Sequence, residues 1–210
     1  MGKKIVGSLI CGVYISIGAT AFIALENPVA GAFFFTAGIL MVSAFYGMLV
    51  TRVIALFPYK EYGISDVVLS LLGNTVGCVI YAASLGLTRF GNDANVAKLE
   101  RIVGLRLSDG YVSLFILAVL CGFLVACACL SAKVFPDNKT VSMFLTVMFI
   151  AVFVVCGFEH IVADSFFFAY YSVVKGFEMK FVAAFAVVAA GNIAGGMSAG
   201  YLERFRNGEK

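Results

Sequence analysis

The sequence predicts an all-α membrane protein with six transmembrane helices. Its 210 residues are 62% hydrophobic and only 13% charged, and the mean hydropathy is +1.02. Soluble domains are about half apolar and about one quarter charged, so these values exclude a water-soluble globule. A bilayer core about 30 Å thick takes about 20 apolar residues per helix. The chain therefore has room for about six spans, and none for a separate catalytic domain outside the membrane.

Polar residues divide the chain into six apolar segments, and each segment justifies one predicted helix. The second and fifth segments, at about 30 residues each, are longer than one straight crossing needs, and both contain polar groups at depth. Long, interrupted segments at matching places in two halves are typical of broken helices around a central site. We therefore expect helices two and five to be broken. The segments run over about residues 5–25, 29–57, 66–87, 108–132, 141–171 and 181–201.

Short motifs recur in the two halves of the chain in the same order. The matched pairs are residues 10–12 with 120–122, residues 73–77 with 191–195, and Thr51 with His160, at offsets of 110, 118 and 109. With three spans in each copy, the second copy enters the membrane from the opposite side. This predicts an inverted 3+3 repeat within a single pore domain over residues 1–210, with copies at about residues 5–87 and 108–201. Such repeats are typical of channels and transporters.

Charge and motif content predict how the protein is oriented in the membrane, and they argue against nucleic-acid-binding, metal-binding and enzymatic functions. An even number of spans puts both termini on one side, which carries eight Lys and Arg residues against six on the other side. This predicts cytoplasmic termini in a multi-pass protein of the inner cell membrane. A net charge of +3 gives no reason to expect nucleic acid as a partner. We find no metal-type CxxC spacing and no Ser/His/Asp cluster, so we expect no metal, no cofactor and no enzyme.

His160 is the main candidate for a functional residue. It is the only histidine in the chain and lies inside the fifth apolar segment, where an ionisable side chain is expected to have a function. A neutral imidazole donates a hydrogen bond, and a protonated one holds an anion. Burial favours the neutral form and an arriving anion the charged one. We expect His160 to line a pore rather than to bond a helix carbonyl, and Glu159 to brace the break through unwound backbone amides.

Other polar and bulky residues complete the expected pore. The Thr51 hydroxyl is able to bond an anion or a backbone carbonyl, and its place opposite His160 favours the pore role over bonding within its own helix. Phe35 and Phe153 are candidate constrictions on either side, although the chain has 21 Phe and packing is the alternative for each. Asn192, like its counterpart in the first half, is expected to tie a broken helix together with its amide.

At this point the residues resemble the formate–nitrite transporter family over nearly the whole chain. The resemblance implies an aquaporin-like protomer with one pore, a homopentamer in the lipid bilayer, and conduction of small monovalent anions such as formate, nitrite or hydrosulfide. The motifs that carry it are residues 12–18, 49–51 and 73–74, the Gly-Phe-Glu-His stretch at 157–160, and Gly-Asn-Ile-Ala-Gly-Gly at 191–196.

Matched by position, the resemblance assigns roles to the pore residues. His160 is similar to the central pore histidine, and Thr51 to the threonine of the loop that interrupts the second helix. Leu49 and Phe35 are similar to residues of a cytoplasmic-side constriction, and Phe153 to the outer one.

The resemblance also assigns a supporting network and shows where the chain departs from the family. Glu159 and Asn192 are similar to the network behind the histidine, and Arg106 stands in place of a family lysine, as a positive group that attracts anions to the outer mouth. The fourth segment lacks one anchoring asparagine. The departures from the family pattern are Val50, Arg52 and Gly122. Arg52 is expected either to flank the break or to extend to the cytoplasmic interface, and we favour the second.

The sequence thus predicts a channel or transporter for small monovalent anions, linked to proton movement through His160. A channel for neutral small solutes such as water or glycerol shares the architecture and is the main alternative. A membrane-bound redox subunit would use histidine as a haem ligand, but a single histidine offers no bis-histidine pair.

Overall fold

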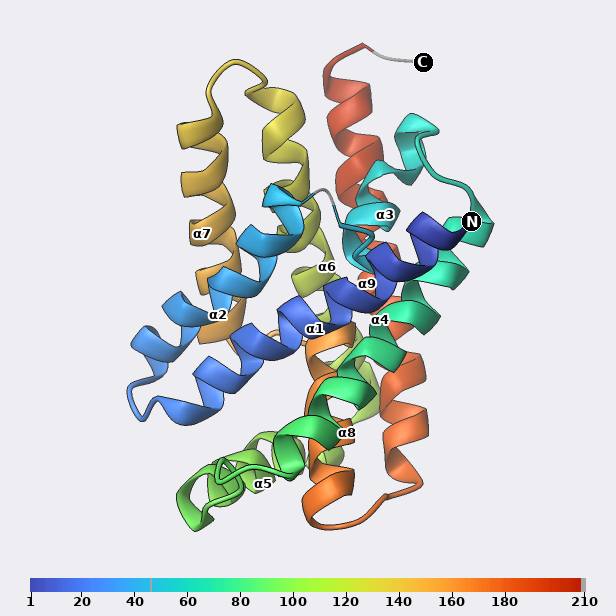
Figure 1. Ribbon diagram of the computed structural model, residues 1–210. Helices are drawn as coiled ribbons and strands as arrows, with labels where there is room; N and C mark the ends of the chain where they lie inside the picture. The colour runs from blue at the N-terminus through green and yellow to red at the C-terminus, as the bar shows by residue number, and fades with distance from the viewer. Residues whose placement is uncertain (46, 209–210) are drawn as a thin grey trace.

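The computed structural model describes residues 1–45 and 47–208, and these residues form helices joined by short connections (Figure 1). One short 3₁₀ turn, Phe57–Tyr59, follows the third helix, and the described residues contain no strand. This confirms the predicted all-α class. The helices are α1 Gly2–Ala24, α2 Pro28–Ala44, α3 Val50–Leu56, α4 Ile64–Gly86, α5 Asp93–Ser108, α6 Tyr111–Val134, α7 Lys139–Val155, α8 Ile161–Val174 and α9 Lys180–Arg206.

Four of these helices, α1, α4, α6 and α9, are long and apolar enough to cross a membrane, with 23 to 27 residues each. The two long predicted segments are each occupied by a pair of shorter helices. Helices α2 and α3 lie within residues 29–57 apart from the first residue of α2, and α7 and α8 lie at about residues 141–171. The outer surface carries large exposed apolar side chains, among them Phe33, Val76 and Ile116, as expected of helices that face lipid.

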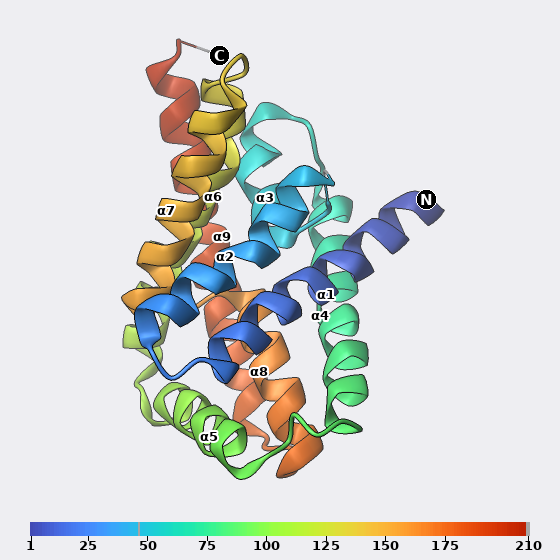
Figure 2. The same cartoon turned by 60° about the vertical axis from the view of Figure 1, so that its left-hand side comes forward.

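Helix α5 is of a different kind from the others, because five of its 16 residues are charged. The side chain of Asn92, the residue before the helix, caps the first turn by accepting a hydrogen bond from Asn95 N–H. Leu99, Ile102 and Val103 are the buried residues of the helix. It lies at one end of the molecule, which we call the α5 end. The two termini lie toward the opposite, terminal end (Figure 1 and Figure 2).

Glycines bring two pairs of helices into close contact, α1 with α4 and α6 with α9. A Cβ atom at Gly12 would lie 2.1 Å from the carbonyl oxygen of Asn74, and one at Gly122 would lie 2.5 Å from that of Asn192. Neither distance is compatible with a side chain, so both crossings place backbone directly on backbone. Small residues at helix contacts are the usual basis of such packing in membranes.

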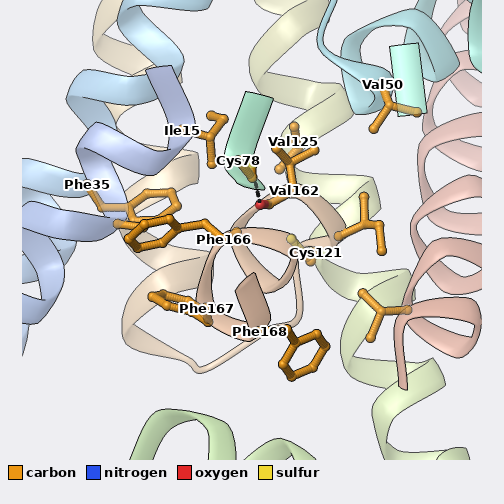
Figure 3. Packing of buried hydrophobic residues seen from close by; sticks show 14 of the residues in the cluster. Ile15, Phe35, Val50, Cys78, Cys121, Val125, Val162, Phe166, Phe167 and Phe168 are labelled. Carbon is orange, nitrogen blue, oxygen red and sulfur yellow. Dashed lines mark hydrogen bonds between the residues drawn. The ribbon is translucent and has the colours of Figure 1, made fainter. Parts of the chain in front are cut away.

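Helix α8 begins near the centre of the molecule, among the side chains of α1, α4 and α6 (Figure 3). The Cys78 thiol of α4 donates a hydrogen bond to the carbonyl oxygen of Val162 at 3.4 Å. Phe166 of α8 is fully buried and its ring is stacked on that of Tyr170, with centroids 5.8 Å apart. The start of α8 is therefore held rigidly by the core, which fixes the residues that immediately precede it.

Candidate functional site

The first helix interruption, between α2 and α3, is held by the amide side chain of Asn74 from α4. Its Oδ1 accepts a hydrogen bond from Val50 N–H at 2.8 Å. Its Nδ2 donates to the carbonyl oxygens of Ser8 and Met48 at 2.7 and 3.0 Å. Where a helix stops inside an apolar environment, backbone groups lose their partners. Asn74 supplies those partners, which is the role that the sequence predicts for it.

The second interruption, between α7 and α8, is held in the same way by Asn192 from α9. Its Oδ1 accepts from Ile161 N–H at 2.9 Å. Its Nδ2 donates to the carbonyl oxygens of Ala118 and Glu159, both at 2.8 Å. The partners of Asn192 follow those of Asn74 at offsets of 110 or 111 residues.

This shared pattern corrects one match made from the sequence. Leu49 and His160 are each the residue immediately before a half-helix, α3 and α8 respectively. Leu49 is therefore the counterpart of His160, and Thr51 is the counterpart of Val162. The offset between Thr51 and His160 suggested otherwise because glycine-rich landmarks fix a register only to within a few residues.

His160 nevertheless contacts Thr51 directly. The imidazole is buried, with 1% of its surface exposed. Its Nδ1 accepts a hydrogen bond from Ala163 N–H at 3.3 Å and so caps α8, while its Nε2 lies 3.3 Å from Thr51 Oγ1. Because Nδ1 is an acceptor, the neutral ring carries its proton on Nε2 and donates it to the Thr51 oxygen. The hydroxyl hydrogen of Thr51 is then left to donate to a further acceptor.

A cavity of about 300 Å³ extends from His160 to α5. Every charged side chain that lines it is basic, namely Lys98, Arg101 and Arg106 from α5. The remaining wall is mainly apolar and aromatic. It is formed by Phe22, Phe35, Ile102, Leu105, Phe153, Val154, Gly157, Phe158, Ala163 and Phe167.

Phe35 and Phe153 lie together rather than on opposite sides, which differs from the prediction. Their ring centroids are 5.7 Å apart in an edge-to-face arrangement at 87°, and the centroid of Phe153 is also 5.7 Å from that of His160. Both rings line the cavity on the α5 side. The reason is the direction of α2, which begins near the α5 end, so that position 35 precedes the interruption by several residues (Figure 1).

Arg106 is bound by two buried carboxylates. Its Nε lies 2.7 Å from Asp164 Oδ1, and its Nη2 lies 2.8 Å from Glu159 Oε2. One guanidinium thus faces two acidic groups, and the pairing fastens α5 to the interruption and to the first turn of α8. The Glu159 side chain takes a different partner from the predicted backbone amides. No role was predicted for Asp164, although a carboxylate in an apolar run indicates a buried cation nearby.

Lys98 is fastened to the end of α1. Its ammonium donates hydrogen bonds to the carbonyl oxygens of Phe22 and Leu25 and lies 4.6 Å from the centroid of the Phe22 ring. A cation at a helix C-terminus also interacts favourably with the helix dipole. Burial lowers the pKa of Lys98 below its ordinary value; the charge of Arg101 lowers it further, and that of Glu26 opposes the shift.

Comparison with known families decides where the chain belongs. A family model described as formate/nitrite transporter matches residues 1–202. The chain belongs to the formate/nitrite transporter family. This confirms the resemblance seen in the sequence, and with it a multi-pass membrane transport protein that is not an enzyme.

Solved structures share the fold of this formate/nitrite transporter. A "Pentameric formate channel with formate bound" has a TM-score of 0.83 at 18% identity, over 98% of this chain and 96% of that one. An "FNT family ion channel" has a TM-score of 0.83 at 18% identity, over 97% of this chain and 89% of that one. At this identity the likeness shows a common fold. Comparison with curated protein sequences finds no match.

Two departures from the family pattern, Val50 and Arg52, lie in α3 next to the first interruption, and the third, Gly122, lies in α6. Val50 is buried at the first residue of α3. Arg52 donates from Nη1 to the carbonyl oxygen of Gly47 at 3.2 Å and to the Tyr62 hydroxyl at 3.1 Å. These contacts agree with the alternative that Arg52 flanks the break rather than with the favoured extension to the interface, because the carbonyl of Gly47 beyond α2 is one of its partners. Gly122 supports the backbone of the residue that holds the second interruption.

Proposed function

We propose that the protein is a membrane channel for small monovalent anions of the formate, nitrite or hydrosulfide class, linked to proton movement through His160. The observation that carries the proposal is the cavity between α5 and His160. Its charged lining is wholly basic, and its inner part is an aromatic wall around one buried imidazole. A basic, low-dielectric cavity raises the local concentration of anions.

The architecture that we propose has six spans in an inverted repeat. The spans are α1, α2 with α3, α4, α6, α7 with α8, and α9, in two copies at about residues 5–87 and 108–201 of one pore domain. Two observations support it. The interruptions are held by equivalent amides, and both glycine crossings involve the helix that carries the amide. We further propose a homopentamer, in which each protomer has its own pore, as the description of the related pentameric channel suggests.

We propose that both termini are cytoplasmic and that α5 lies on the outer side of an inner cell membrane. The distribution of basic residues, eight against six, supports this orientation.

In the proposed pathway the anion enters at the α5 end and loses water between α5 and the Phe35–Phe153 pair. A bare charge near the bilayer centre costs about 3 kcal/mol or more, so a proton that accompanies the anion lowers the barrier by forming the neutral acid. Beyond the rings, the Thr51 hydroxyl, whose oxygen accepts the Nε2–H of His160, replaces lost water as a hydrogen-bond donor, and the anion competes with that oxygen for the Nε2–H. The N-terminus of α8 adds the positive end of its dipole at the same point.

The proposal is tested with purified protein in liposomes. Stopped-flow uptake of formate, nitrite and hydrosulfide, each at two pH values, is expected to exceed that of protein-free liposomes and to rise at the lower pH. Osmotic swelling in glycerol and urea provides the opposing measurement. Swelling in neutral solutes without anion uptake would support the neutral-solute channel instead.

A further inference from the structure

Helix α5 presents three basic side chains to the cavity, and two of them already have strong partners. The guanidinium of Arg106 is bound at 2.7 and 2.8 Å by the carboxylates of Asp164 and Glu159. Both acids contact the guanidinium directly and offset its positive charge. Arg106 therefore contributes little net positive potential to the cavity and serves to hold α5 in place.

Lys98 also has hydrogen-bond partners within the protein. Two of its three donor hydrogens are directed to the carbonyl oxygens of Phe22 and Leu25 at the end of α1. Glu26, in the turn that follows, acts on the same ammonium. An anion that approached Lys98 would have to compete with these groups.

Arg101 differs from both. It lines the same cavity and is exposed, and within residues 1–45 and 47–208 it has no hydrogen bond or ion pair. The neighbouring acid, Glu100, does not neutralise it, because Glu100 is paired with Lys175 at 2.7 Å. The five donor hydrogens of Arg101 are therefore free to bind a ligand at the mouth of the cavity.

We propose that Arg101 is the residue that captures the anion at the outer mouth and sets its apparent affinity. This inference rests on the proposed anion channel and assigns the capture step to one side chain. A guanidinium presents parallel N–H groups that bind two oxygens of a planar anion at once, whereas an ammonium acts as a point charge. Formate and nitrite have two such oxygens and hydrosulfide has none. Arg101 is thus expected to favour planar two-oxygen anions over hydrosulfide.

The test compares Arg101→Gln and Arg101→Lys with the unchanged protein in liposomes. Arg89→Gln is the matched control, since Arg89 is an exposed arginine of the preceding loop that does not line the cavity. In Arg101→Gln, the half-saturating concentration of formate and nitrite is expected to rise about threefold to tenfold at low ionic strength. The maximal rate is expected to change less than twofold. The difference should vanish near 1 M salt, where the screening length is about 3 Å.

Arg101→Lys separates charge from geometry. It is expected to raise the half-saturating concentration of formate and nitrite while leaving that of hydrosulfide unchanged. The inference is overturned if Arg101→Gln behaves like Arg89→Gln for every anion and salt concentration. It is also overturned if the three anions respond equally to Arg101→Lys. Failure of the unchanged protein to take up any of the anions would instead reject the proposed function itself.

Discussion

Nε2 of His160 lies 3.3 Å from Oγ1 of Thr51, although the two residues are 109 positions apart in the chain. Thr51 lies in the first turn of α3 and His160 immediately before α8, so this contact joins the starts of the two half-helices. Both side chains are buried, and the same imidazole caps α8 through Nδ1. His160 thus has a structural role and a donor role at the same time, and substitutions can separate the two.

His160→Asn and His160→Ala are expected to differ in stability but not in transport. Asparagine retains an oxygen that caps α8, whereas alanine removes the cap at a cost of about 1 kcal/mol. Both remove Nε2–H, and we expect each to reduce anion uptake about tenfold or more and to flatten its pH dependence. Thermal unfolding in detergent and stopped-flow uptake provide the two measurements. Unchanged uptake and pH dependence in both variants would reject the pore role of His160.

Thr51→Val removes a hydroxyl with little change of shape. We expect uptake to fall about tenfold, the equivalent of one hydrogen bond of about 1.4 kcal/mol. Thr51→Ser keeps the hydroxyl and is expected to transport at nearly the original rate. Equal uptake by the valine and serine variants would show that the hydroxyl does not contact the anion.

Asn192→Ala is expected to destabilise the protein by about 3 kcal/mol. It leaves the backbone groups of Ala118, Glu159 and Ile161 without partners in a buried setting. Ser198→Ala, on the same helix, is the control, because Ser198 is exposed and donates only to Ala194 O; its effect should stay within about 0.5 kcal/mol. Equal unfolding temperatures for both variants would contradict the bracing role of Asn192.

Arg106→Met is expected to destabilise the protein by about 3 to 5 kcal/mol, since it leaves two buried carboxylates without their cation. Combining it with Glu159→Gln and Asp164→Asn removes the unpaired charge and should recover part of the loss. Chemical denaturation of the unchanged protein, of Arg106→Met and of the triple variant checks this expectation. If the triple variant were as unstable as Arg106→Met alone, the loss would come from packing rather than charge.

Gly122→Ala is expected to disrupt the crossing of α6 and α9, because its Cβ would lie 2.5 Å from the backbone oxygen of Asn192. Gly104→Ala in α5 is the control, since no atom lies within 4 Å of the added Cβ. The control should stabilise the protein by up to about 1 kcal/mol through helix propensity. Yields of folded protein on size-exclusion chromatography would distinguish the two.

Much of the fold could be predicted from hydropathy, because a chain in lipid must satisfy its backbone within helices. Polar residues marked the ends of the apolar segments. The length of the second and fifth segments, and the polar groups inside them, predicted that each would be interrupted. Helix α5 was not predicted, since its 16 residues are amphipathic and too polar to register as an apolar segment. It nevertheless supplies every charged side chain of the cavity wall.

The sequence pointed to His160 and Thr51 but not to the contacts of the residues around them, and the pore role of both stays a prediction. A single histidine in an apolar run drew attention to His160. Thr51 was chosen through an offset of 109 residues that the structure corrects, although the two side chains do lie in contact. The edge-to-face contact of Phe35 with Phe153 depends on how α2 packs against α7, which no local pattern specifies. The pairing of Arg106 with Asp164, 58 residues away, is likewise a product of tertiary packing.

The anchoring of α5 has a mechanical consequence. The helix is tied to α1 by Lys98, to the residue after α8 by the pairing of Glu100 with Lys175, and to the start of α8 by Arg106. Because the three attachments are at different points along α5, the helix is not expected to rotate about any one of them. We therefore expect the cavity between α5 and His160 to keep a constant width, so that it selects solutes by size and charge without an opening movement.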